Sequence, residues 1–348
     1  MDDSLKHTQA VQKLYFSPQA AGLLAPLQSF LDDTAVSEMV LNRPQEIFIE
    51  KHGKFTRHGV PSFTESKLAV LFQLIANENK QVLSPEKPLL SGSLQDGSRV
   101  QLVLPPVAKH YTFAVRRQSV KSFRLDDYKA QEFYQDAQQF DLQAPALSQM
   151  PQKERELVAL YQKNEWHLFI KQAIHLKKNI VISGGTSSGK TTFLNACLGE
   201  IPLDERIITL EDTREMDVPH PNQVNLLASK GEQGMAKVDM QSLVQCCLRL
   251  RPDRIIMGEI RGKEILDFLG ACSTGHEGSI TSIHANNPRV AFMRMTQMYK
   301  QNNVPSMSDA DIVRELHEVV DVIVQIAKTD KGRQVQSMYY KHGGLTPC

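Results

Sequence analysis

The chain has 348 residues and a mass of 39.2 kDa, so we expect about two domains rather than one hydrophobic core. Hydrophobic residues make up 41% of it and charged residues 23%, which are globular proportions and exclude a mostly disordered protein. The 40 Lys and Arg residues nearly balance the 39 Asp and Glu residues, and a formal net charge of +1 gives no support for a protein that coats nucleic acid or an anionic membrane.

The first residues, MDDSLKHTQ, contain no apolar segment of the kind that a signal peptide needs. No stretch of the chain approaches the roughly 18 consecutive apolar residues of a membrane-spanning helix. A signal peptide and a membrane span are therefore both disfavoured.

Residues 36–107 alternate short apolar runs with turn signals, which is typical of strands and hairpins. The signals are Asn42-Arg43-Pro44, His52-Gly53 and Asp96-Gly97. Between them, SFTESKLAVLFQLIANEN begins with a Ser/Thr cap candidate and predicts a helix with four apolar residues on one face, Leu68, Leu71, Phe72 and Ile75. We therefore expect an α+β domain with an antiparallel sheet over residues 1–140.

A polar segment with two prolines, DLQAPALSQMPQ, predicts a linker over residues 141–155, followed by a second domain over residues 156–348. That domain opens with one expected helix whose core face carries Leu157, Leu160, Trp166, Phe169 and Ile170. Four β runs (NIVIS, RIITLED, RIIMGE and SITSIHA) then alternate with helical stretches, which predicts a mostly parallel α/β sheet covered on both faces. Two further strands around a Lys-Gly turn are expected near the C-terminus.

Five cysteines, an odd number without a Cys-x-x-Cys array, argue against a zinc ribbon and against a disulfide scaffold. Free cysteine is most often a small buried side chain. We therefore expect buried, reduced thiols of a cytosolic protein at Cys197, Cys246, Cys247, Cys272 and Cys348.

The segment GGTSSGKTT fits G-x-x-x-x-G-K-[ST] at every fixed position, with a β run before it and a helical stretch after it. Successive backbone N–H groups in such a loop, together with the positive end of a helix, form an anion site. Lys190 could then reach the β- and γ-phosphates of a nucleotide, and the Thr191 hydroxyl could bind Mg²⁺. The candidate nucleotide-binding residues of this loop are Gly184, Gly185, Thr186, Ser187, Ser188, Gly189, Lys190, Thr191 and Thr192.

Two acidic clusters follow β runs. Glu259 comes after Ile255-Ile256-Met257, and Glu211 and Asp212 come after Ile207-Ile208. A carboxylate at such a strand end can hold Mg²⁺ or polarise the attacking water. The alternative for each is a solvated strand end.

Two histidines, His276 and His284, flank the short β run SITSI downstream of the second carboxylate. Imidazole can donate a hydrogen bond to a phosphate oxygen or relay a strand shift, so this position suits a sensor of the γ-phosphate. The alternative is an ordinary histidine whose ring bonds are satisfied within the fold.

GGTSSGKTT, IITLEDTRE and LRLRPDRIIMGEIRGKEILDFLGACSTGHEGSITSIHAN resemble the Walker A, Asp, Walker B and His boxes of the secretion-ATPase superfamily, in that family's order. Residues 36–340 fit the family. Within it the chain is most similar to the VirB-eleven type, the traffic ATPase of type IV secretion and conjugation machines. Three features favour this branch: the phrases DGSRVQLVLPP and FAVRRQS, a short N-terminal domain, and no four-cysteine module after the Walker B box.

The resemblance implies a RecA-like P-loop C-terminal domain, a smaller α+β N-terminal domain, nucleotide between them, and a ring of six subunits. ATP and Mg²⁺ would be the ligands of Lys190 and Thr191. Glu211 would activate water, Glu259 would bind Mg²⁺ and His284 would belong to the His box, although the roles of the two glutamates could be exchanged. Ser187 departs from the family's usual Gly; a serine fits that position if its φ is negative, and we then expect binding to survive.

The resemblance further implies that the N-terminal domain contributes arginines. Arg99 and Arg116 match positions that reach the γ-phosphate in the family, with Arg117 as the alternative to Arg116. A guanidinium offers a planar fork for phosphate oxygens and neutralises charge in the transition state. Losing the γ-phosphate would then release the N-terminal domain and couple hydrolysis to movement.

The implied function is ATP hydrolysis that drives substrate export or assembly of a type IV secretion apparatus. Its partners would be inner-membrane components of that machine and, indirectly, a protein or DNA–protein substrate, with the ATPase cytoplasmic and peripheral at the inner membrane. The alternatives are a type II secretion or type IV pilus motor and a nucleotide-gated docking switch with little turnover. A nucleic-acid translocase is disfavoured by the neutral net charge.

Overall fold

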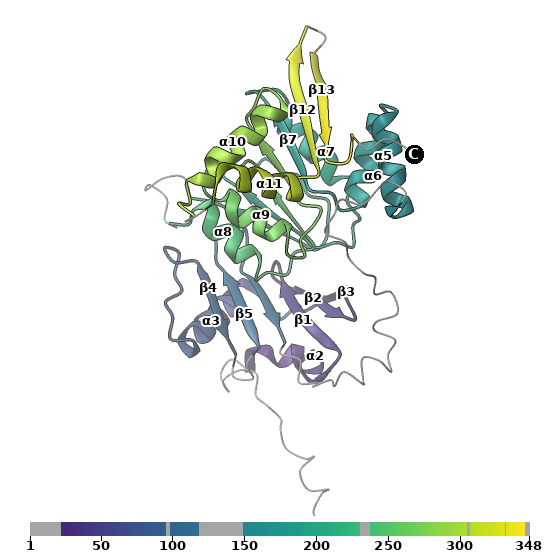
Figure 1. The fold of residues 1–348 in the computed structure, drawn as a ribbon. Helices are drawn as coiled ribbons and strands as arrows, with labels where there is room; N and C mark the ends of the chain where they lie inside the picture. Colours follow the sequence, from purple (N-terminus) through teal and green to yellow (C-terminus); the bar gives the residue numbers. More distant parts are fainter. Residues whose placement is uncertain are drawn as a thin grey trace, which may run out of the picture. The chain divides into compact units, whose positions relative to one another are not determined.

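The computed structural model describes residues 22–94, 98–117, 149–229, 237–304, 307–330 and 332–344. These residues form two compact units, one from the described residues up to 117 together with Lys237 and one from the other described residues (Figure 1). Each unit has its own sheet and its own hydrophobic core. The prediction of an α/β fold with a P-loop unit and a smaller α+β unit is confirmed.

The first unit is built on a six-stranded sheet with the order β3-β2-β1-β6-β5-β4, in which all neighbours are antiparallel. Its strands are β1 (Val36–Leu41), β2 (Glu46–Lys51), β3 (Lys54–Gly59), β4 (Leu89–Ser93), β5 (Arg99–Val103) and β6 (Thr112–Arg116). Two short helices, η1 (Ala25–Leu27) and α2 (Gln28–Asp32), precede them. The predicted hairpins at Asn42-Arg43-Pro44 and His52-Gly53 join β1 to β2 and β2 to β3.

Helix α3 (Glu65–Glu78) covers one face of this sheet. Thr64 caps it by accepting a hydrogen bond from the Lys67 amide, as the Ser/Thr signal predicted. The four residues expected on its core face are buried and share one cluster with alternate residues of the strands. Burial of these side chains fixes α3 on the sheet.

The second unit contains a seven-stranded sheet with the order β13-β12-β7-β11-β10-β8-β9. All neighbours are parallel except β12 and β13, which form the predicted C-terminal hairpin. The strands are β7 (Ile180–Gly184), β8 (Ile207–Glu211), β9 (Gln223–Leu227), β10 (Arg254–Met257), β11 (Ile280–Ile283), β12 (Val322–Thr329) and β13 (Gly332–Tyr340). Because the strands are parallel, their carboxyl ends meet at one edge of the sheet.

Seven helices of the described chain cover this sheet: α5 (Gln152–Gln162), α6 (Trp166–His175), α7 (Lys190–Leu198), α8 (Met240–Cys247), α9 (Ile265–Cys272), α10 (Pro288–Lys300) and α11 (Asp309–Val319). Helices α5, α6 and α7 share one core cluster with Ile180 and Ile182 of β7. Figure 1 shows α8, α9, α10 and α11 gathered on the other side of the sheet. Helices on both faces leave the carboxyl edge for the site.

The single helix expected after the linker is two helices. Asn164 has a φ of +58°, in the left-handed region that an α-helix cannot include, so α5 ends and α6 begins in a new direction. Trp166, expected in the core, starts α6 and is 37% exposed, whereas Leu157 and Phe169 are buried as predicted. Residues 152–155 are helical rather than part of a linker, while residues 141–148 lie outside the described residues.

Four of the five cysteines lie in the described chain, and all four are free and buried, as expected. Burial raises the pKa of the Cys197 and Cys272 thiols to about 12, so both stay protonated at neutral pH. Cys348 lies outside the described residues. Among the residues that the structure describes, no helix is both long and apolar enough to cross a membrane.

Arg254, at the start of β10, is fully buried and paired with a carboxylate. Its Nε and Nη2 donate to the two oxygens of Glu205 at 2.8 and 2.9 Å, and its Nη1 donates to the Ile174 carbonyl of α6 at 2.7 Å. Burial acts to raise the pKa of Glu205, but Arg254, with a contribution from Lys177, brings this pKa below its ordinary value. The pair therefore links α6 to the sheet. Removing either partner would leave the other charge buried without a counter-charge, which costs free energy.

Replacing Glu205 by Ala would leave Arg254 buried without its partner charge. We expect Glu205→Ala to lower the free energy of unfolding by about 3 kcal/mol at pH 7, measured by urea unfolding. Because the folded pKa of Glu205 is depressed, its contribution is present at neutral pH and is lost as the pH falls through that pKa, so the two proteins converge in acid.

The matched control is Glu200→Ala. Glu200 pairs with Lys171 at 3.1 Å on the surface, and such pairs contribute about 1 kcal/mol or less. Equal losses of unfolding free energy in the two variants would show that the buried Arg254–Glu205 pair stabilises the fold no more than a surface pair.

Candidate functional site

The loop between β7 and α7 lies at the carboxyl edge of the sheet and follows the predicted phosphate motif. Gly184 ends β7, and a Cβ built on it would lie 2.5 Å from the Ile326 carbonyl oxygen of β12 and 2.5 Å from Ser188 Oγ. Gly189 has a φ of +98° and precedes Lys190, the first residue of α7. Only glycine fits both positions, and the resulting turn directs the first amides of α7 toward one point.

Lys190 is buried within this loop. Its Nζ donates to the carbonyl oxygens of Gly184 and Gly185 at 3.1 and 3.0 Å and lies 3.3 Å from His284 Nδ1. Burial lowers the pKa of the Lys190 ammonium, and the charge of Glu259 opposes this effect. The loop therefore holds one cation at its centre, ready to meet an anion.

Charged side chains continue from Lys190 across the carboxyl ends of the neighbouring strands. His284, just after β11, places Nε2 3.2 Å from Glu259 Oε1, and Arg261 Nη2 donates to Glu259 Oε2 at 2.8 Å. Arg261 also pairs with Asp212, which follows β8. The structure therefore brings together Lys190, His284 and Glu259, three residues that the sequence nominated separately.

Burial lowers the pKa of His284, and the nearby Lys190 ammonium acts in the same direction while Glu259 opposes it. The ring is then neutral at pH 7. A neutral ring that accepts from Lys190 at Nδ1 carries its proton on Nε2 and donates it to Glu259. His284 thus links the cation of the loop to the carboxylate beyond β10.

Glu211 ends β8, beside the turn that leads to Glu259. Its Oε1 accepts from the backbone amides of Glu215 and Met216 at 2.7 and 2.8 Å. Burial raises the pKa of this carboxyl, although the two amides oppose the shift. A fixed carboxylate of raised basicity is suited to accept a proton or orient a water molecule.

A hollow of about 220 Å³ lies over the outer side of the loop. It is lined by the loop residues from Ser187 to Thr192 and by Arg333 of β13. The buried Ser188 hydroxyl has no hydrogen-bond partner within the described chain. Among the described residues that line it are two cations, Lys190 and Arg333, and no carboxylate, which suits an anionic ligand.

The condition under which Ser187 was expected to fit the loop is not met. Its φ is +58°, in the left-handed region where a side chain costs roughly 1 kcal/mol, and glycine would adopt it freely. The Ser187 carbonyl accepts a hydrogen bond from Arg333 Nε at 3.2 Å. This contact from β13 opposes the strain.

His276 does not join the site. It precedes β11 and hydrogen-bonds through Nδ1 to the Pro252 carbonyl, which precedes β10. Both positions are at the amino ends of the strands, and His284 is at the carboxyl end of the same β11. The two histidines flank one strand and therefore lie at opposite edges of the sheet, so the suggested phosphate-sensing role of His276 finds no support here.

Arg99 and Arg116 lie in the first unit as register partners on β5 and β6. Val100 and Val115 beside them point into the core with α3, so the two arginines share the opposite face, where both are exposed. Arg116 is also the register partner of Glu38 on β1. Arg117, the alternative candidate, donates to the Asp33 carbonyl, which ties it to the edge of its own unit.

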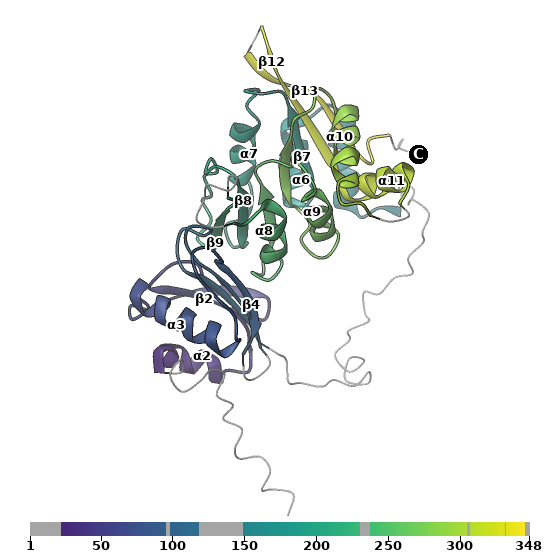
Figure 2. The same ribbon diagram turned by 90° about the vertical axis from the view of Figure 1, so that its left-hand side faces the viewer.

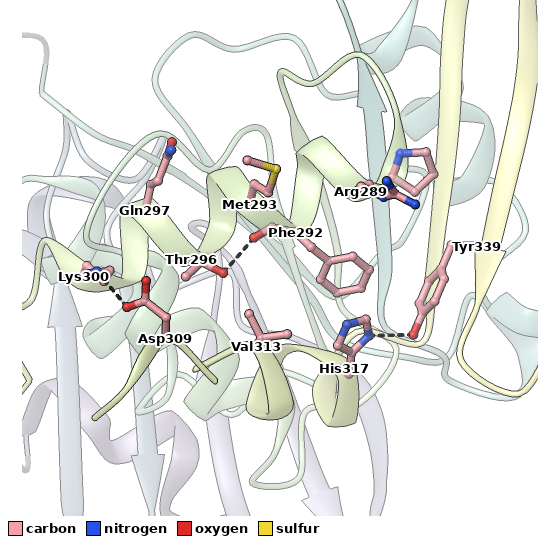
Figure 3. Close-up of a pocket in the computed structure, with 11 residues that line it drawn as sticks. Arg289, Phe292, Met293, Thr296, Gln297, Lys300, Asp309, Val313, His317 and Tyr339 are labelled. Atoms are coloured by element: carbon pink, nitrogen blue, oxygen red, sulfur yellow. Dashed lines mark hydrogen bonds and ion pairs between the residues drawn. The ribbon is translucent and has the colours of Figure 1, made fainter. Parts of the chain in front are cut away.

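A second hollow, of about 770 Å³, lies between α10, α11 and β13. Figure 3 shows Phe292 and Val313 facing it, with the His317–Tyr339 hydrogen bond at one end and the Lys300–Asp309 ion pair at the other. No residue of the phosphate loop lines it. It is therefore not the nucleotide site.

The family model described as "Type II/IV secretion system protein" matches residues 21–342. The chain belongs to this family. It is 36% identical over 326 residues to the type IV secretion system protein VirB11 of Brucella suis, covering 91% of this chain and 89% of that protein, and 34% identical over 325 residues to VirB11 of Bartonella henselae, covering 91% of each. These relatives confirm the secretion-ATPase prediction made from the four boxes.

The fold matches as well. A crystal structure of the VirB11 ATPase from the Brucella suis type IV secretion system in complex with sulphate superposes with a TM-score of 0.84 at 33% identity, covering 93% of this chain and 98% of that chain. The two units of this type II/IV secretion protein therefore share the fold of that VirB11 ATPase.

Two residues of the site had no predicted role. Arg261 belongs to the GEIRG part of the Walker B box, and its spacing of two from Glu259 was the available signal. Arg333 follows a turn more than a hundred residues after the loop, and nothing local in the sequence marks it.

The two adjacent glycines at the start of the loop provide a test of its geometry. In Gly184→Ala the new methyl group would meet a backbone carbonyl and Ser188, and we expect a loss of about 1–3 kcal/mol in the free energy of unfolding without nucleotide. In Gly185→Ala nothing lies within 4 Å of the new Cβ, so we expect a change within about 0.5 kcal/mol. Similar values for both variants, measured by urea unfolding, would contradict the tight packing of Gly184 against β12.

Proposed function

We propose that this member of the family hydrolyses ATP to drive substrate export or assembly of a type IV secretion apparatus. The observation that carries the proposal is Lys190, held in the phosphate loop and joined through His284 to Glu259. The cation of the phosphate loop and the carboxylate beyond β10 are thus joined by one imidazole that contacts both. This combination is suited to binding a nucleoside triphosphate and to responding when its last phosphate leaves.

The residues of the loop fit a triphosphate. The unpartnered Ser188 hydroxyl, the start of α7 and Lys190 converge on the hollow of about 220 Å³. On binding, Lys190 would exchange its carbonyl partners for phosphate oxygens, and the Thr191 hydroxyl would help to hold Mg²⁺. When bound, Mg²⁺ neutralises charge between the β- and γ-phosphates.

The geometry favours Glu211 as the residue that orients or deprotonates water, because two amides fix one of its oxygens and burial makes it more basic. Glu259 is then the proposed Mg²⁺ ligand. Its present partners, His284 and Arg261, would share the carboxylate with the cation or give it up. In either case His284 responds to the charge state of Glu259.

Arg99 and Arg116 are the proposed arginines of the first unit. Like charges that face each other across two strands repel, unless an anion or an acidic neighbour offsets them. Glu38 on β1 is the register partner of Arg116, and the pair itself places two positive charges on one exposed face. We propose that this pair contacts the γ-phosphate. Departure of that phosphate after hydrolysis would then let the first unit move.

We further propose a ring of six subunits, which a head-to-tail interface produces when its rotation closes. The ring would work in the cytoplasm, peripheral to the inner membrane, on membrane components of the secretion machine. The substrate, a protein or a DNA–protein complex, would be engaged indirectly.

Phosphate release from purified protein separates a motor from a nucleotide-gated switch. We expect steady turnover that is lost in Lys190→Ala together with nucleotide binding. Arg99→Ala and Arg116→Ala should lower the turnover by roughly 10³-fold, with little change in affinity for ADP, because an arginine finger acts on the transition state. Turnover near zero in the unaltered protein would favour the switch.

The control for the arginines is Arg57→Ala, in which an exposed arginine of the same unit loses its pairing with Glu46 on the neighbouring strand. We expect this variant to keep its turnover. Normal hydrolysis in both Arg99→Ala and Arg116→Ala would remove the first unit from the reaction.

The ring has a direct test. Light scattering after size-exclusion chromatography, with and without ATP and Mg²⁺, should reveal a species near six times 39.2 kDa. A particle that remains at the monomer mass under both conditions would contradict the ring.

A further inference from the structure

The C-terminal hairpin is joined directly to the phosphate loop. β12 pairs with β7 in parallel as far as Ile326, whose register partner is Gly184, the residue where the loop begins. Both strands of the hairpin are longer than the central strands of the sheet, and Figures 1 and 2 show them extending beyond it. The chain therefore returns, near its C-terminus, to the side of the nucleotide loop.

Arg333 is the residue by which β13 contacts the loop. Its Nε donates to the Ser187 carbonyl at 3.2 Å, and its Cδ lies 2.9 Å from the position that a Cβ on Gly189 would occupy. A side chain at position 189 would therefore displace Arg333. Gly189, which precedes α7, therefore leaves room for the arginine as well as for the backbone turn.

Arg333 lines the hollow over the loop, and most N–H groups of its guanidinium are not used in the contact with the loop. A guanidinium carries five N–H groups, and only the Nε group donates to Ser187. Within the described residues the terminal nitrogens of Arg333 have no carboxylate partner, and the hollow contains none. A planar fork facing a row of amides and hydroxyls from Ser188 to Thr192 is suited to a phosphate group.

The two cations at the loop, Lys190 and Arg333, face different sides of it. Lys190 Nζ points to Gly184, Gly185 and His284, on the side of Glu259. Arg333 approaches over Ser187 and Gly189, beside the start of α7 and away from that carboxylate. We propose, on the basis of the proposed function, that Arg333 binds the diphosphate portion of the nucleotide, which ATP and ADP share, and holds the loop closed over it.

Calorimetric titration of the full chain with ADP, and with a non-hydrolysable ATP analogue in the presence of Mg²⁺, tests this proposal. Because a charge-assisted hydrogen bond to phosphate is lost, Arg333→Ala should weaken both ligands by a similar factor of roughly tenfold or more. Arg333→Lys keeps the charge but not the planar fork, so its affinities for both ligands should fall between those of the unaltered protein and those of Arg333→Ala. Unchanged binding of both ligands, or a loss confined to the ATP analogue, would overturn the proposal.

The matched control is Lys328→Ala, which removes an exposed cation at the register partner of Arg333 on the facing strand of the same hairpin. We expect its affinities to stay within about twofold of the unaltered protein, as for a charge that does not touch the ligand. An equal loss in Lys328→Ala would mean that the hairpin acts only through its general charge, which also overturns the proposal.

A chemical readout separates contact from positioning of the loop. Phenylglyoxal modifies accessible guanidinium groups, and peptide mass spectrometry locates the modified residues. Saturating ADP should slow modification of Arg333 but not of Arg314, an exposed arginine of α11. Equal modification of Arg333 with and without ADP would overturn direct contact.

Failure of the proposal is distinguishable from failure of the proposed function. If the unaltered protein binds ADP and Lys190→Ala does not, while Arg333→Ala binds normally, only the role of Arg333 fails. If the unaltered protein binds neither nucleotide, the proposed function itself fails. Thermal unfolding of each variant without nucleotide verifies that the fold is intact.

Discussion

The position of Lys190, held by the carbonyls of its own loop and facing the His284 ring, is the constraint on which the site depends. It requires β7 and β11 to be parallel neighbours, because the loop follows one strand and His284 follows the other. The next strands, β10 and β8, add Glu259 and Glu211 at the same edge. Strand order, rather than any local motif, makes these residues into one site.

Charges of alternating sign along this edge limit the free-energy cost of partly burying them. In the His284–Glu259 pair, Lys190 lies beside His284 and Arg261 pairs with Glu259. Arg261 also pairs with Asp212. Each partly buried charge has an opposite charge or a polar group beside it, as burial requires. The arrangement leaves the outer side of the loop positive, since Arg333 stands there without a carboxylate neighbour in the described chain. An incoming anion therefore meets cations first and carboxylates only at its far end.

The sequence predicted what depends on local chemistry. The phosphate loop, the cap and core face of α3, and the strand and hairpin runs all follow from residue spacing within short segments. It could not show which of the two histidines, His276 or His284, lies at the edge of the phosphate loop, because this depends on β11 running parallel to β7. The left-handed Asn164 and Ser187 were missed, since neither is a glycine. Arg333 reaches the loop only through the pairing of β12 with β7.

That pairing also governs the order in which the chain can fold as it leaves the ribosome. Both neighbours of β7, β11 and β12, are synthesised after it, and β12 is the later of the two. The sheet of the first unit, by contrast, is complete once β6 has emerged, and domains tend to fold as units during synthesis. The phosphate loop therefore lacks the support of β12 on one side until that strand has been synthesised, so the first unit can fold before the loop is complete.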